Sequence, residues 1–152
     1  MQGDPQVLEV LNEVLTAELT AINQYFLHAK MCEHWGYGRL AATVRVESID
    51  EMKHADSLTD RILFLGRLPN FQRLSPLRIS ETVVEQFESD LQLEYNAINR
   101  LNRAVALCVE VGDNGPRELL ASILVSEEEH ADWLETITQI GAELYLSQKL
   151  YS

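Results

Sequence analysis

The sequence repeats one short motif that combines a carboxylate with an imidazole. Glu-x-x-His occurs at Glu51 and His54, and again at Glu127 and His130. Residues three positions apart on a helix lie on the same face, so each motif directs its two side chains toward one point. The motif is therefore typical of a metal site carried on a helix.

Two further glutamates extend the pattern. Glu18 precedes the first motif by 33 residues, and Glu94 precedes the second by the same interval. The surrounding residues also repeat, since Glu18-Leu-Thr-Ala-Ile-Asn corresponds to Glu94-Tyr-Asn-Ala-Ile-Asn at an offset of 76 positions. The same offset separates the two motifs. These intervals indicate an internal pseudo-repeat, in which each half of the chain supplies half of one site.

Four carboxylates and two imidazoles that converge on one point favour a site for two metal ions. Carboxylates buried together repel one another, and two divalent cations would cancel their charge. The mixture of oxygen and nitrogen ligands suits iron or manganese without excluding zinc. Di-iron carboxylate bundles use the same set, one glutamate from each of two helices and Glu-x-x-His from each of the others. The alternative is a hydrogen-bonded polar layer without metal. The candidate ligands are Glu18, Glu51, His54, Glu94, Glu127 and His130.

The positions of glycine and proline predict that these residues lie on four long helices. Only 7 glycines and 4 prolines interrupt the chain, and they leave open stretches at 6–35, 39–65, 77–111 and 117–140. Such lengths suit helices rather than strands. An apolar stripe recurs at helical spacing along each stretch, with the glutamates and histidines in its middle. We expect a short fifth helix near 142–150.

The lengths of the connections predict how the helices are arranged. The breaks near 36–38 and 112–116 are short, so the first two helices and the last two should form antiparallel hairpins. Segment 66–80 can span about 50 Å when extended, whereas a helix the length of the second is about 40 Å long. It can cross the whole bundle and place the third helix parallel to the second. We expect an all-α four-helix bundle with one long crossover, forming a single domain over 1–152.

Composition narrows the classes of function. The 152 residues carry 12 basic and 24 acidic side chains, and the net charge of −12 argues against binding to nucleic acid or to an anionic membrane. No apolar run of about 18 residues is present, and the N-terminus lacks the features of a signal peptide. We therefore expect a cytoplasmic protein. Cys32 and Cys108 are too few for a disulfide framework or a cysteine-rich metal site.

A second apolar stripe lies outside the predicted metal site. Met52 lies about 100° around its helix from Glu51. One bundle core cannot use both stripes of the first helix, so we expect a subunit interface there. From periodicity alone, Met52 is more typical of interface packing than of a ligand. The second stripe of the first helix comprises Leu15, Leu19, Ile22 and Phe26.

Several longer segments resemble the bacterioferritin family. The longest is Glu47-Ser-Ile-Asp-Glu-Met-Lys-His-Ala-Asp, which spans the first Glu-x-x-His motif. The others are Asn23-Gln-Tyr-Phe-Leu-His, Trp35-Gly, Asp60-Arg-Ile-Leu-Phe-Leu, Leu68-Pro-Asn and Glu127-Glu-Glu-His. The resemblance covers essentially the whole chain and implies the ferritin-like form of the four-helix bundle. It also implies a homo-oligomer, a hollow shell of 24 subunits that stores iron.

The resemblance assigns roles to the candidate residues. It implies that the six ligands bind two iron ions per subunit as a ferroxidase centre, with Glu51 and Glu127 bridging the metals. Fe²⁺ is then the substrate, and O₂ or peroxide accepts its electrons. Met52 is implied to ligate haem b, one haem per two subunits, together with the symmetry-related Met52. A ferredoxin-like protein is the implied reductant of the haem.

Two positions depart from the pattern of the family. Many members have histidine at the position of Val46, where it helps to bind iron on the inner surface beside the equivalent of Asp50. Val46 cannot ligate a metal, so the sequence does not predict that accessory site. Arg45 stands where an aromatic residue is often found near the haem.

Two other classes of function remain open on the sequence alone. One is a di-iron or di-manganese oxidase or peroxidase of the rubrerythrin type, which works on peroxide without storing mineral. Such proteins usually carry a Cys-x-x-Cys electron-transfer module, and this sequence contains none. The other class is a non-enzymatic helical interaction protein. A storage shell would be a far larger particle than an oxidase or peroxidase of the rubrerythrin type. Metal analysis distinguishes a storage protein from a helical interaction protein, which would bind no metal.

Overall fold

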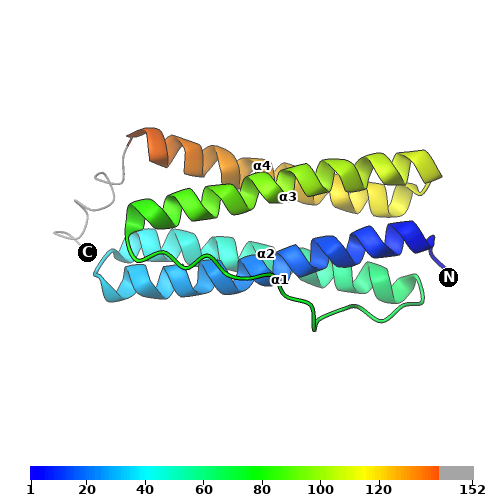
Figure 1. The fold of residues 1–152 in the computed structure, drawn as a ribbon, viewed down its shortest axis with the longest axis horizontal. Helices are drawn as coiled ribbons and strands as arrows, with labels where there is room; N and C mark the ends of the chain where they lie inside the picture. Colours follow the sequence, from blue (N-terminus) through cyan, green and yellow to red (C-terminus); the bar gives the residue numbers. More distant parts are fainter. Residues whose placement is uncertain (141–152) are drawn as a thin grey trace.

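The computed structural model describes residues 1–140, which form four long helices (Figure 1). No strand occurs within this range, so the all-α prediction is confirmed. The fifth helix expected near 142–150 lies outside the described residues. No described helix has the length and apolar character that a membrane span requires. The helices are α1 (Pro5–His34), α2 (Gly38–Phe64), α3 (Val83–Val111) and α4 (Asn114–Ile140).

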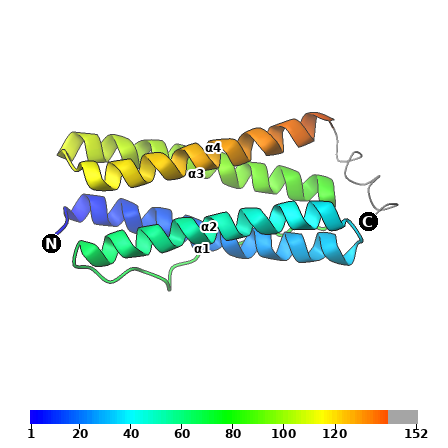
Figure 2. The same cartoon turned by 180° about the vertical axis from the view of Figure 1, so that it is seen from behind.

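The helices are connected as the lengths of the loops predict. Two antiparallel hairpins, α1–α2 and α3–α4, pack against each other, and the segment after α2 runs back along the bundle to the start of α3 (Figures 1 and 2). As a result α2 and α3 run in one direction, while α1 and α4 run in the other. This order places one half of the pseudo-repeat opposite the other, across the long axis of the bundle.

Two apolar clusters fill the bundle on either side of its middle. One contains Leu11 and Leu58 toward the free end of α1, and the other contains Leu40 and Phe87 toward the opposite end. In every helix the candidate ligands fall between the residues of these two clusters. The apolar packing on both sides therefore holds the polar middle in register. Leu15, expected on the second stripe, is instead fully buried in the first cluster.

The third helix begins two residues later than the predicted crossover, 66–80, would allow. The stretch free of strong breakers begins at 77, but α3 begins at Val83, where the Thr82 hydroxyl accepts a hydrogen bond from the backbone N–H of Glu85. Residues 77–82 instead continue the crossover. The predicted start of the fourth helix is also late, because α4 already begins at Asn114. Pro116 lies in its first turn, where the missing N–H removes no helical hydrogen bond.

A ladder of side chains on α1 keeps the crossover extended. Polar residues on one face of α1 accept hydrogen bonds from backbone N–H groups of the crossover, so those groups need no helical partners. The pairs, acceptor residue first, are Asn12 with Asn70 (2.9 Å), Thr20 with Ser75 (3.1 Å), Gln24 with Arg78 (3.1 Å) and His28 with Ser80 (3.2 Å).

Asp90 on α3 anchors this ladder to the second hairpin. Its Oδ1 atom accepts a hydrogen bond from Gln24 Nε2 at 2.9 Å and lies 2.9 Å from His28 Nδ1. All three side chains are buried. Because the Nε2 atom of His28 accepts from Ser80, its Nδ1 atom carries the proton donated to Asp90. The network joins α1, α3 and the crossover.

Candidate metal centre

The structure brings the six candidate ligands together in the middle of the bundle. Each helix contributes at least one of them, and the four carboxylates are almost completely buried. The two imidazoles retain slight exposure, 14% for the side chain of His54 and 12% for that of His130. The residues are Glu18 on α1, Glu51 and His54 on α2, Glu94 on α3, and Glu127 and His130 on α4.

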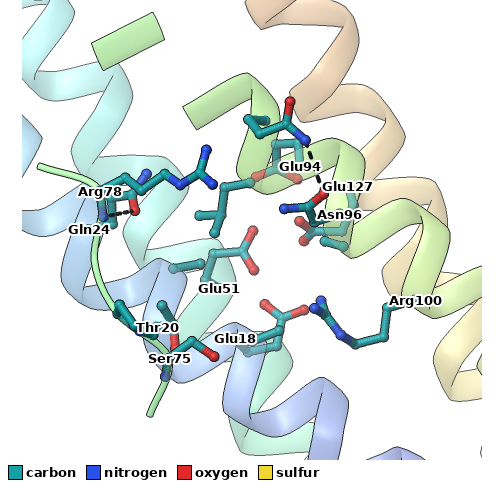
Figure 3. A pocket seen from close by; sticks show the side chains of 16 residues that line it. Glu18, Thr20, Gln24, Glu51, Ser75, Arg78, Glu94, Asn96, Arg100 and Glu127 are labelled. Atoms are coloured by element: carbon teal, nitrogen blue, oxygen red, sulfur yellow. Dashed lines mark hydrogen bonds between the residues drawn. The ribbon is translucent and has the colours of Figure 1, made fainter. Parts of the chain in front are cut away.

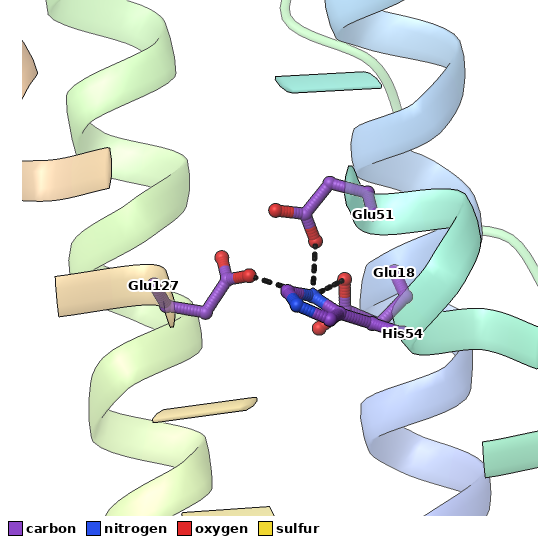
Figure 4. Close-up of side chains that lie close together, drawn as sticks. All are labelled: Glu18, Glu51, His54 and Glu127. Carbon is purple, nitrogen blue, oxygen red and sulfur yellow. Dashed lines mark ion pairs between the residues drawn. The ribbon is translucent and has the colours of Figure 1, made fainter. Parts of the chain in front are cut away.

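In the first group of four residues, three carboxylates surround one imidazole nitrogen (Figure 4). The Nδ1 atom of His54 lies 3.0 Å from Glu127 Oε1 and 3.5 Å from an oxygen of both Glu18 and Glu51. One proton on that nitrogen cannot serve three carboxylates in these directions. The group has the geometry and the charge to hold a cation.

A second group shares two carboxylates with the first. His130 Nδ1 lies 3.2 Å from Glu51 Oε1 and 3.8 Å from Glu94 Oε1. Glu127 belongs to both groups, as does Glu51, and within each group one candidate ligand atom per residue lies within 4.8 Å of the others. The Nε2 atom of His130 lies 3.4 Å from Asp50 Oδ2, a contact that fixes the ring with its other nitrogen toward the cluster.

Most polar atoms of the cluster lack a hydrogen-bond partner. Within residues 1–140, eight buried side-chain oxygen or nitrogen atoms have none, and seven belong to the six candidate ligands. Buried polar groups are normally paired, since an unpartnered one is costly. Cations at these two positions would supply the missing partners. The eighth atom is Glu47 Oε2.

The cluster distributes its protons unevenly. Burial alone raises the pKa of Glu51, but the nearby imidazoles of His130 and His54 outweigh it and lower that pKa to about 2. Burial, followed by contact with Glu94 and the charge of Glu51, raises the pKa of Glu127 far above its ordinary value. Burial lowers the pKa of His130, but Glu51 and Glu94 outweigh it and raise the value to about 11. The cluster therefore favours protons on Glu127 and His130 over a proton on Glu51.

Two neighbours of the cluster are not among the predicted ligands. The hydroxyl of Tyr25, fully buried on α1, donates a hydrogen bond to Glu94 Oε1. Glu47 lies one turn before Glu51 on α2, and burial raises its pKa well above the ordinary value. Its spacing of four residues from Glu51 is a sequence signal for the same helix face.

A pocket of about 320 Å³ opens onto the carboxylate side of the cluster (Figure 3). All four glutamates line it and neither histidine does. Its outer wall comes from α3 and from the crossover at Ser75, Pro76 and Arg78. The cluster is therefore reachable by small molecules.

Met52 lies outside this cluster on the exposed face of α2. It is 56% exposed, and the other apolar residues near it in sequence on α2, Val46 and Ile49, are also exposed. On α1, Phe26 is 47% exposed and lies beneath the guanidinium of Arg45, 5.6 Å from ring centroid to Cζ. An apolar face of this kind is typical of an interface.

The chain is similar to known proteins over nearly its whole length. Residues 8–143 match the family described as the ferritin-like domain. Bacterioferritins from Mycobacterium bovis and Mycobacterium tuberculosis are 55% identical over 97% of this chain and 96% of theirs. The bacterioferritin of Streptomyces coelicolor is 52% identical over 97% of this chain and 90% of its own.

Solved structures show the same relationship. The Mycobacterium tuberculosis bacterioferritin BfrA superposes with a TM-score of 0.93 at 54% identity, covering 98% of this chain and 96% of its own. A further structure of mycobacterial bacterioferritin also gives 0.93, at 53% identity, over 97% of this chain and 94% of its own. Since both sequence and fold agree along almost the entire chain, the protein belongs to the bacterioferritin family of ferritin-like domains.

Proposed function

We propose that this protein stores iron and oxidises Fe²⁺ to Fe³⁺ at the carboxylate cluster. The observation that carries the proposal is the pair of overlapping four-residue groups, whose buried atoms lack partners in a chain of the bacterioferritin family. Iron is the substrate and the stored cargo. The electron acceptor is O₂ or peroxide, small enough to enter the adjacent pocket.

In this proposal the six residues divide into two terminal pairs and two bridges. Glu18 and His54 hold one iron ion, and Glu94 with His130 holds the other. Glu51 and Glu127, which belong to both groups, bridge the two ions. Four carboxylates balance two divalent cations, so the filled site is neutral and the repulsion between the glutamates is removed.

The product, Fe³⁺, is stored as hydrated mineral inside a cytoplasmic shell of 24 subunits. Each subunit has 24 acidic and 12 basic residues, and the resulting net charge of −12 attracts cations. Removal of the four ligand glutamates from the count still leaves eight excess negative charges. That excess would draw Fe²⁺ toward the protein beyond the oxidation site itself.

We place haem b at Met52, between two copies of the chain. Met52 and Ile49 lie three residues apart on α2 and are both exposed. The thioether of a methionine on such an apolar face suits a flat apolar group with an iron atom at its centre. When bound, haem supplies one-electron transfer between a ferredoxin-like reductant and the interior. Met52 from each subunit would hold the haem iron, and the apolar residues of this face would exclude water from the group.

Loss of a terminal ligand should slow iron oxidation. We expect Glu18→Ala and Glu94→Ala each to lower the initial aerobic rate of Fe²⁺ oxidation by about tenfold or more, because each removes a carboxylate from one metal position. The formation of Fe³⁺ is followed by absorbance. Glu128→Ala is the matched control, since Glu128 is exposed beside Glu127 and should retain the rate. Unchanged rates in both ligand variants would contradict the assignment of the site.

Metal binding should release protons. At pH 7, Glu127 and His130 hold protons that divalent cations must displace, so loading with redox-inert Zn²⁺ should release about two protons per chain. Because both pKa values are raised, metal affinity falls as pH decreases. A pH indicator in weakly buffered solution measures the release. His34→Gln, which removes an exposed histidine, should release the same number. Binding of zinc without any proton release would contradict the proposed ligands.

Haem binding should depend on Met52. Protein expressed with adequate haem should show a Soret band, and Met52→Leu should abolish it because leucine keeps the apolar volume without the sulfur ligand. Met31→Leu removes a methionine that contacts Gln86 instead and should keep the band. A Soret band that persists in Met52→Leu would show that another residue ligates the haem.

A further inference from the structure

Two arginines line the pocket on the carboxylate side of the cluster. Arg78 comes from the crossover and Arg100 from α3, and their guanidinium groups point into the pocket from opposite sides (Figure 3). Within residues 1–140, neither guanidinium forms an ion pair or a side-chain hydrogen bond. The other arginines in this range form no ion pair either, and what distinguishes Arg78 and Arg100 is that both line the pocket.

The fold holds Arg78 in this position. Its backbone N–H donates to Gln24 Oε1 at 3.1 Å, and Gln24 Nε2 in turn donates to Asp90 at 2.9 Å. Both partners are buried, with relative exposures of 1%. The backbone of the crossover is therefore fixed where the Arg78 side chain enters the pocket. The anchor acts on the backbone, and the exposed Arg78 side chain extends from it toward the pocket.

Arg100 supplies a second cation that is partly removed from water. It is half-buried on α3, and burial together with the charge of Arg103 lowers its pKa. A guanidinium stays protonated under such conditions and presents paired N–H donors that match an oxyanion. Asn96 and Gln92 line the same wall, and the hydrogen bond from Gln92 Nε2 to Asn96 Oδ1 orients the Asn96 amide.

The glutamates on the pocket floor make anion binding conditional. Four carboxylates repel an anion, whereas the same carboxylates filled with two divalent cations carry no net charge. We propose that the pocket binds inorganic phosphate between Arg78 and Arg100 when the neighbouring cluster holds metal ions. The inference rests on the proposed function, since it requires the cluster to be a metal site. It adds a phosphate site to the route by which small molecules reach the metals.

Metal and phosphate then bind cooperatively. Because coupling between two sites is reciprocal, phosphate raises the affinity for metal by the same factor by which metal raises the affinity for phosphate. A tetrahedral oxyanion suits two guanidinium groups that approach from opposite sides. The pocket volume of about 320 Å³ accommodates phosphate together with water.

The test measures phosphate beside Co²⁺, a paramagnetic and air-stable probe of the cluster. Protein loaded with Co²⁺ and freed of excess metal is titrated with inorganic phosphate, and broadening of the ³¹P resonance reports binding near the metal. We expect broadening in the unmodified protein and about tenfold weaker phosphate affinity in Arg78→Gln and in Arg100→Gln. Arg100→Lys, which keeps the charge, should lose less affinity than Arg100→Gln.

Arg103→Gln provides the matched control. Arg103 is exposed on α3 and does not line the pocket, so its loss removes one positive charge near Arg100 without changing the site. It should retain the broadening. Circular dichroism and the amount of bound Co²⁺ show that each variant is folded and loaded.

The outcomes separate this inference from the proposed function. If Co²⁺ fails to bind the unmodified chain, the metal site itself is wrong. If Co²⁺ binds but phosphate produces no broadening, the phosphate site is wrong while the metal site stands. Equal broadening in the two glutamine variants and the unmodified protein would also overturn the proposed phosphate site, since phosphate would then bind the metal without the arginines.

Discussion

The mutual repulsion of four buried glutamates is the constraint on which the rest of the structure depends. Glu18, Glu51, Glu94 and Glu127 meet in the bundle interior with few protein donors between them. The apolar clusters on either side of the site hold them there. The favourable free energy of that packing offsets the cost of keeping like charges together. Such an arrangement is stable in its ionised form only with cations, which accounts for both the raised pKa of Glu127 and the metal site proposed here.

The long crossover connects the fold to the chemistry. It lets α2 and α3 run in the same direction, so that α1 packs on α3 and α2 packs on α4 and the two copies of one half-site face each other. The ladder from α1 and the anchor at Asp90 then hold its middle against the opening of the pocket. The same hydrogen bonds that position the crossover therefore also position Arg78 beside the carboxylates.

Local patterns predicted the bundle, its connectivity and the residues of the cluster, because helix periodicity and a fixed offset of 76 are written in the sequence. The start of α3 could not be predicted in this way. Residues 77–82 contain no strong helix breaker, and they stay extended because His28 and Gln24, more than 50 positions away, accept their N–H groups. The burial of Leu15 and the pocket position of Arg100 likewise depend on contacts between distant segments.

Native mass spectrometry after anaerobic addition of Fe²⁺ tests the central claim most directly, because it counts chains and metals on the same particle. We expect a particle of 24 chains, about 415 kDa of protein from subunits of 17.3 kDa, with two iron ions bound per chain at saturation of the cluster. A far smaller particle would contradict storage in a shell. One iron ion or none per chain would contradict the assignment of the buried glutamates to a paired metal site.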